Sequence, residues 1–77
     1  MRIIEGEPRG LHYDKDGKAH AKLDLQVSTI EELPAIDEEV EGIGTDPGSI
    51  AQLIQTGDWV TLDADGDWYD GSGSVVS

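Results

Sequence analysis

Acidic residues are the most numerous candidates for chemistry in this sequence of 77 residues. Four aspartates stand between Asp63 and Asp70, as they would in a calcium-binding loop. An EF-hand loop, however, needs glycine at its sixth position and a bidentate acidic residue at its twelfth. Counted from Asp63, these positions hold Trp68 and Ser74. Because Asp and Gly also favour tight turns, the sequence predicts a solvated turn here rather than a calcium site.

His12 and His20 are the second candidates, since imidazole is a common metal ligand. A three-residue hairpin loop at 15–17 would place them opposite each other on the polar face of two strands. Two ligands fall short of the three of a catalytic zinc site and the four of a structural one, and Lys22 nearby disfavours a cation. The sequence therefore predicts no metal site, and a surface histidine pair whose protonation changes near about pH 6.

Catalytic groups are not evident. In so acidic a chain two carboxylates come close together by chance, so such a pair does not indicate a general acid and base. No serine lies in a sequence context typical of a nucleophile. A glycine-rich phosphate loop that ends in lysine is also missing. We therefore expect a protein that is not an enzyme and has no catalytic residue, no cofactor and no metal.

The elements that would position these side chains begin with a hairpin over 10–27. Residues 19–27 alternate apolar and polar side chains without exception, which is typical of a half-buried strand. Residues 14–17 begin with Asp and end with Gly, as in a type I turn that closes a three-residue loop. This loop sets a register in which apolar side chains share one face. Its pairs are Asp14 with Lys18, Tyr13 with Ala19, and Leu11 with Ala21.

Residues 28–48 predict an acidic connector. Ser28 and Glu31 match a capping box, but Pro34 leaves room for about one helical turn. The stretch 34–48 is acidic and interrupted by glycine and proline, which indicates an exposed loop. Three apolar residues are expected to attach it to the core: Ile36, Val40 and Ile43.

Residues 49–70 predict an antiparallel meander with strands near 49–55, 59–63 and 67–70. The turn at 63–66 repeats the Asp-x-Asp-Gly pattern of 14–17 and places Leu62 opposite Trp68. Trp59 and Tyr69 then point to the other side of the meander. The glycines and serines of 71–77 are typical of a flexible tail. Overall we expect a single mainly β domain with an N-terminal hairpin arm (1–27), an acidic connector (28–48), a C-terminal three-stranded meander (49–70) and a tail (71–77).

Composition limits the partners of this chain. Its net charge of −12 repels phosphate backbones, so nucleic-acid binding is not expected. The apolar runs are far shorter than the roughly 20 residues of a membrane span, and the N-terminal residues lack a secretion signal. So short a chain without cysteine is expected to need a partner subunit, which predicts a homo-oligomer, with a trimer as one option. Its expected interface residues are Leu11, Tyr13, Leu23, Leu25, Val27, Trp59 and Tyr69.

One segment resembles a module of small proteins encoded in phage and prophage structural gene clusters. The resemblance covers about 27–70 and rests on the run 48–68, which contains Gly48-Ser49-Ile50-Ala51, Thr56-Gly57, Leu62-Asp63 and Gly66-Asp67-Trp68. It implies a virion component, such as a head decoration, head fibre or tail accessory protein, that contacts phage capsid or tail proteins. Its implied location is the virion, and the host cytoplasm before assembly.

Two other functions fit the same composition. A DNA-mimic inhibitor would present rows of carboxylates at phosphate-like spacing and block a DNA-binding enzyme. A generic interaction domain from a longer product would also be compatible with the glycine and serine residues of 71–77. A decoration protein differs from a mimic in spreading its charge and keeping an apolar docking surface.

Overall fold

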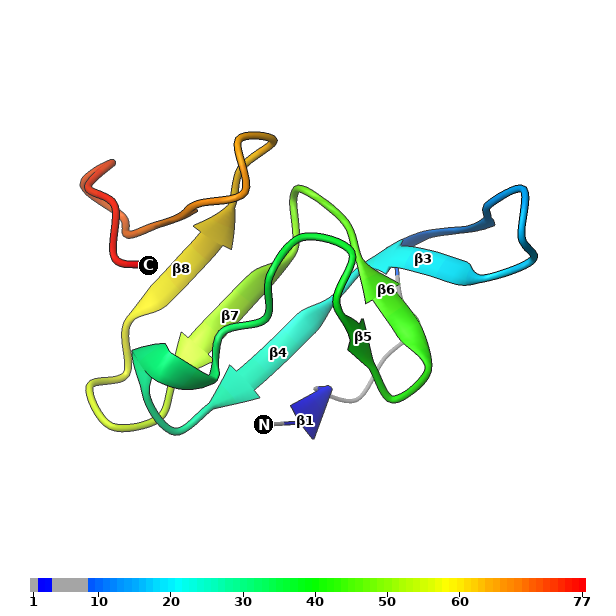
Figure 1. Cartoon of the computed structure of the whole chain (residues 1–77). Coiled ribbons are helices and arrows are strands. Elements are labelled where there is room, and N and C mark those ends of the chain that lie inside the picture. The colour runs from blue at the N-terminus through cyan, green and yellow to red at the C-terminus, as the bar shows by residue number, and fades with distance from the viewer. Residues whose placement is uncertain (1, 4–8) are drawn as a thin grey trace.

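The computed structural model describes residues 2–3 and 9–77, and this part of the chain is mainly β. Figure 1 shows short strands joined by turns, with one 3-10 turn between β4 and β5. The elements are β1 (Arg2–Ile3), β2 (Arg9–Tyr13), β3 (Ala19–Lys22), β4 (Asp24–Val27), η1 (Ile30–Glu32), β5 (Glu39–Val40), β6 (Ile43–Thr45), β7 (Ile50–Leu53), β8 (Trp59–Leu62) and β9 (Trp68–Tyr69). In the described ranges, no helix is long and apolar enough to cross a membrane.

The described strands form two mixed sheets, which confirms the prediction of a mainly β fold. One sheet has five strands in the order β1-β4-β7-β8-β9, and the other has four in the order β2-β3-β6-β5. Most neighbours are antiparallel, but β3 pairs in parallel with β6, and β4 pairs in parallel with β7. In Figure 1, β4, β7 and β8 lie side by side, and β3 leads directly into β4.

The segment predicted as one strand over 19–27 serves both sheets. Leu23 lies between β3 of the four-stranded sheet and β4 of the five-stranded sheet. Its backbone N–H donates to Ser49 Oγ at 2.9 Å, and its carbonyl accepts from the N–H of Ile50 at 2.9 Å. The predicted alternation is confirmed, since every second side chain from Ala21 to Val27 is fully buried.

The stretch 34–48 is not the simple connector that its composition predicts. It contains β5 and β6, which form an antiparallel pair, and β6 extends the sheet of β3. These strands are too short to show a period of two, and a parallel partner distant in sequence leaves no turn signal. Val40 is buried and Ile43 packs against the core as expected, whereas Ile36 is exposed.

The turn at 14–17 forms as predicted. The backbone N–H of Gly17 donates to the carbonyl of Asp14 at 3.0 Å and closes the three-residue loop. Beyond it the register shifts along β2, where Gly10 has a φ of 64°, so the predicted pairing of Leu11 with Ala21 does not form. The pairs observed between β2 and β3 are Tyr13 with Ala19, His12 with His20, and Arg9 with Lys22.

The predicted antiparallel meander is present as β7, β8 and β9, with Leu62 opposite Trp68. Because β7 also pairs with β4, the meander and the N-terminal hairpin share one fold. Residues 71–77, whose composition predicts a flexible tail, fold back on β9. The N–H of Gly73 donates to the carbonyl of Asp70 at 3.1 Å, and the N–H of Val76 donates to the carbonyl of Trp68 at 2.8 Å. An Asp and a Gly three residues apart again direct a turn.

The core is built from side chains of both sheets, and the loop that follows η1 packs against it. Trp68 is almost fully buried, and its indole Nε1–H donates to the carbonyl of Pro34 at 2.8 Å. The single helical turn is present, but its N-cap is Thr29 rather than Ser28, and no side chain caps it. The buried apolar residues are Ala21, Leu23, Leu25, Val27, Val40, Ala51, Leu53, Val60, Leu62 and Trp68.

Candidate functional site

The face of the five-stranded sheet that points away from the core is the first candidate site. Residues that are paired across neighbouring strands project to the same side of a sheet. One row runs from Ile50 to Thr61 and on to Tyr69 and Val75, and a second joins Gln26, Gln52 and Trp59. We call these residues the outer sheet face: Gln26, Ile50, Gln52, Trp59, Thr61, Tyr69 and Val75.

The seven residues of the outer sheet face carry no carboxylate or basic group, although 29% of the chain is charged. Charged residues stand only at the ends of the two rows, where the backbone of Arg2 pairs with Gln26 and that of Asp24 pairs with Ile50. The first row ends at Asp24, whose carboxylate is neutralised by Arg9 at 2.9 Å. Trp59 and Val75 are exposed and Tyr69 is partly exposed. Exposed aromatic groups on an uncharged surface are typical of a protein interface.

The sequence-predicted interface residues fall into three places. Trp59 and Tyr69 belong to the outer sheet face, as their predicted direction requires. Leu11 and Tyr13 are exposed, but they lie on β2 in the other sheet. Leu23, Leu25 and Val27 are completely buried inside the single chain, so no surface of these three is available to a partner. This corrects the expectation that another copy must cover the apolar face of the hairpin, because these side chains already form one buried cluster with Val40, Leu62 and Trp68 of the same chain.

Tyr69 is held at the edge of the outer sheet face by the neighbouring turn. Its hydroxyl donates to Asp65 Oδ2 at 2.5 Å. This hydrogen bond raises the pKa of Tyr69 to about 12 and lowers the pKa of Asp65. The contribution of Tyr69 to stability is therefore present below about pH 10 and lost as the pH rises toward 12. The contribution of Asp65 is present above about pH 4 and lost as the pH falls below it.

A spectroscopic titration tests this pair. In a Tyr13→Phe background, Tyr69 is the remaining tyrosine, and its ionisation near 295 nm should have a midpoint at about pH 12. Adding Asp65→Asn should move the midpoint toward about pH 10, because the charged acceptor is removed. Adding Asp58→Asn instead should leave it in place. An identical midpoint with and without the Asp65 carboxylate would contradict the pairing.

The second candidate site surrounds the two histidines. His12 lies opposite His20 as predicted, and the two rings stack with centroids 5.6 Å apart. They are not an isolated surface pair, because three carboxylates from other turns surround them. His20 is nearly buried, with 13% of its side chain exposed. We call this group the histidine cluster: His12, Asp14, His20, Asp37 and Asp46.

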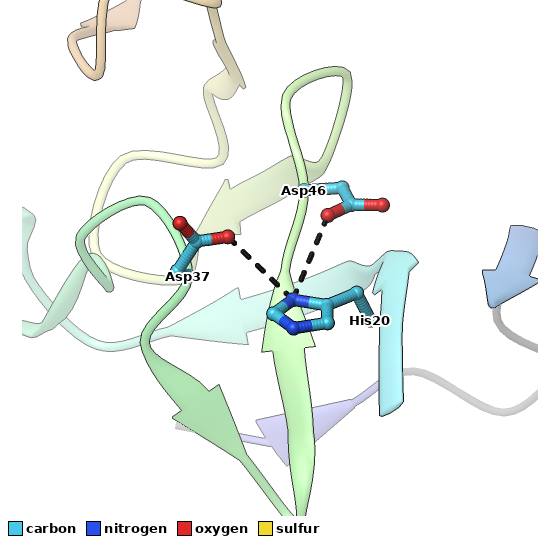
Figure 2. Close-up of side chains that lie close together, drawn as sticks. All are labelled: His20, Asp37 and Asp46. Atoms are coloured by element: carbon cyan, nitrogen blue, oxygen red, sulfur yellow. Dashed lines mark ion pairs between the residues drawn. The ribbon is translucent and has the colours of Figure 1, made fainter. Parts of the chain in front are cut away.

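Hydrogen bonds and short charge contacts join the histidine cluster. The Nε2 atom of His20 is 2.9 Å from Asp14 Oδ2, and the Nε2 atom of His12 is 2.7 Å from Asp46 Oδ2. The hydrogen bond between His20 and Asp14 raises the pKa of His20 and lowers that of Asp14. Figure 2 shows the other nitrogen of His20, Nδ1, facing Asp37 and Asp46, with Oδ1 atoms 3.5 and 3.9 Å away.

The aspartates of 63–70 do not assemble a comparable group. In the described residues, the group of three or more potential metal ligands that lie close together is His20, Asp37 and Asp46. Asp63 and Asp65 instead accept backbone N–H groups of their own turn. Sequence reasoning paired the histidines but missed Asp37 and Asp46, because both come from the stretch predicted as a connector.

Comparisons with known proteins return no match for this chain, whether with protein-family models, with curated proteins or with solved structures.

Proposed function

We propose that this chain is a non-enzymatic, virion-associated structural protein of a phage or prophage, which acts through protein–protein contacts. The outer sheet face joins copies of the chain into a homo-oligomer, and the assembled protein contacts capsid or tail proteins. The observation that carries the proposal is a face on which exposed Trp59 lies among seven uncharged residues, with charged residues only at the row ends, in a chain of net charge −12. The virion assignment is supported by the resemblance of residues 48–68 to modules of phage structural gene clusters.

Charge favours a second copy as the occupant of the outer sheet face. Two chains of net charge −12 repel each other wherever their carboxylates meet. Contact through the uncharged rows keeps most carboxylates at the rim, where water and salt screen them. Trp59 and Tyr69 supply the aromatic area that dominates the energy of such contacts.

Substitution of Trp59 tests the contact. Trp59→Ala is expected to shift the self-association constant toward the monomer by about tenfold or more, because it removes an exposed aromatic anchor. Leu11→Ala is the matched control, since Leu11 is 49% exposed and Trp59 is 48% exposed, on different sheets. Sedimentation equilibrium of both variants and the parent measures the constants. A monomeric parent, or equal effects of the two substitutions, would contradict the proposal.

Salt dependence separates this function from DNA mimicry. A mimic binds a basic groove, so its affinity falls steeply as salt rises. Contact through the outer sheet face should persist or strengthen between about 0.05 and 0.5 M salt, because salt screens the repulsion between copies. Steep loss of binding, reversed by neutralising the exposed Glu38, Glu39 and Glu41 around β5, would favour mimicry.

The virion assignment has its own test. Particles of the phage or prophage that encodes the chain are purified on a density gradient, and their proteins are identified by mass spectrometry. Peptides of this chain should co-purify with the particles at a constant ratio to the capsid or tail proteins. Their absence from intact particles would overturn the assignment, whatever the oligomeric state in solution.

A further inference from the structure

We propose that His20, Asp37 and Asp46 bind one divalent transition-metal cation, for which Zn²⁺ is the probe. Their ligand atoms all lie within 4.8 Å of one another. In Figure 2 both carboxylates face the same imidazole nitrogen, Nδ1 of His20, at 3.5 and 3.9 Å. Zinc–ligand bonds of about 2.0–2.2 Å place neighbouring ligand atoms about 3.4 Å apart in a tetrahedron, so small side-chain movements complete the site.

The hydrogen bond of His20 with Asp14 leaves the second ring nitrogen of His20 available to a cation. A carboxylate only accepts hydrogen bonds, so the Nε2 atom of His20 carries the hydrogen that it donates to Asp14. The other nitrogen, Nδ1, faces the carboxylates of Asp37 and Asp46, so a positive group on Nδ1, either a proton or a metal ion, lies between them. Among the described residues, no lysine or arginine forms an ion pair with these carboxylates. A metal ion bound between the three atoms takes the place of the proton that Nδ1 carries in the charged ring and neutralises the two carboxylates in the same way.

Hydrogen bonds outside the three ligands orient them as in known metal sites. A histidine ligand usually donates its second N–H to a carboxylate, and His20 does so to Asp14. Asp14 is itself fixed by the backbone N–H groups of Asp16 and Lys18, each at 2.9 Å. The ligand Asp46 accepts from His12 at 2.7 Å through its other oxygen, Oδ2. Its Oδ1 atom therefore remains directed toward His20.

The backbone also holds the three ligands together. The N–H of Asp46 donates to the carbonyl of Ala21 at 3.0 Å, and the N–H of Asp37 donates to the carbonyl of Thr45 at 2.8 Å. The ring of His20 lies directly on Gly44, where an added Cβ would clash with Nδ1. The pairing of β3 with β6 thus positions ligands from three separate segments.

The donor set selects the class of metal. One imidazole nitrogen and two carboxylate oxygens suit zinc and its neighbours, and they leave further positions for water. Calcium prefers a shell of oxygen atoms, so a nitrogen ligand disfavours it. The cation would tie β3 to the loops before β5 and after β6, which is a useful staple for a short chain without cysteine. This proposal departs from the sequence expectation of no metal site, which rested on two ligands.

Calorimetric titration with Zn²⁺ of protein previously treated with EDTA tests the site. We expect one ion per chain, and a rise in Tm of about 5 °C or more when Zn²⁺ is about tenfold above its Kd. Calcium at the same concentration should leave Tm unchanged. No binding of Zn²⁺, or an equal response to calcium, would overturn the proposal.

Single substitutions locate the ion. Asp37 is exposed, so Asp37→Asn should keep the fold, as checked by circular dichroism, and weaken Zn²⁺ binding by about tenfold or more. His20→Gln should have the same effect on binding. Asp67→Asn is the matched control, because Asp67 is an exposed aspartate outside the cluster. If Asp37→Asn binds Zn²⁺ as tightly as the control, the ion lies elsewhere and the assignment fails.

Discussion

Replacing Leu23 with alanine is expected to lower the free energy of unfolding by about 2–5 kcal/mol. Leu23 is 0% exposed and lies where the segment 19–27 passes from one sheet to the other. The cavity left by its side chain therefore weakens both sheets. A chain of this length has a total stability of about 4–12 kcal/mol, so the variant is close to the limit of folding. Urea denaturation followed by circular dichroism measures the loss.

Leu11→Ala is the control for this effect, since the same side chain is shortened at an exposed position. Its stability should stay within about 0.5 kcal/mol of the parent. Leu23→Asp should abolish folding, because an unpaired charge would be placed in the core. Similar losses for Leu23→Ala and Leu11→Ala would show that Leu23 does not lie in the core.

Replacing Trp68 with alanine is the second large effect, with an expected loss of about 3–5 kcal/mol. Trp68 is 2% exposed, and its indole donates to the carbonyl of Pro34. The substitution removes the largest buried side chain and also leaves that carbonyl without its partner. Thermal and urea denaturation measure the change in stability.

Trp59→Ala is the matched control. The chain has two tryptophans, and Trp59 is the exposed one. Its loss should be below about 1 kcal/mol, measured at a concentration where the parent is monomeric. The variant that keeps only Trp68 should fluoresce at shorter wavelength than the variant that keeps only Trp59. A larger loss for Trp59→Ala would reverse the assignment of the buried tryptophan.

Local sequence signals predicted the parts of the fold that neighbouring residues determine. An Asp and a Gly three residues apart set the turns at 14–17 and 63–66, and with them the pairing of His12 with His20 and of Leu62 with Trp68. A period of two correctly separated buried from outward side chains over 21–27, whereas Ala19 is not buried and His20 is nearly buried. The same signal at 70–73 was missed, because the composition of 71–77 is that of a linker.

The tertiary structure decided which strands lie beside each other. Parallel pairing of β3 with β6 and of β4 with β7 joins residues distant in sequence, and no turn residue encodes such a pair. This pairing buried Leu23, Leu25 and Val27 inside the single chain, where the sequence alone predicted an interface.

In the two candidate sites as well, some features follow from the local sequence and others from the pairing of distant strands. The sequence by itself determined two features. Strand alternation places the side chains of Trp59 and Tyr69 on the outer side of the meander, and the turn at 14–17 places His12 opposite His20. Two other features depend on strands that pair across long loops. They are the approach of Asp37 and Asp46 to His20, and the joining of two strand rows into the outer sheet face. Only the folded chain decides such contacts, because they arise from packing between segments rather than from the preferences of adjacent residues.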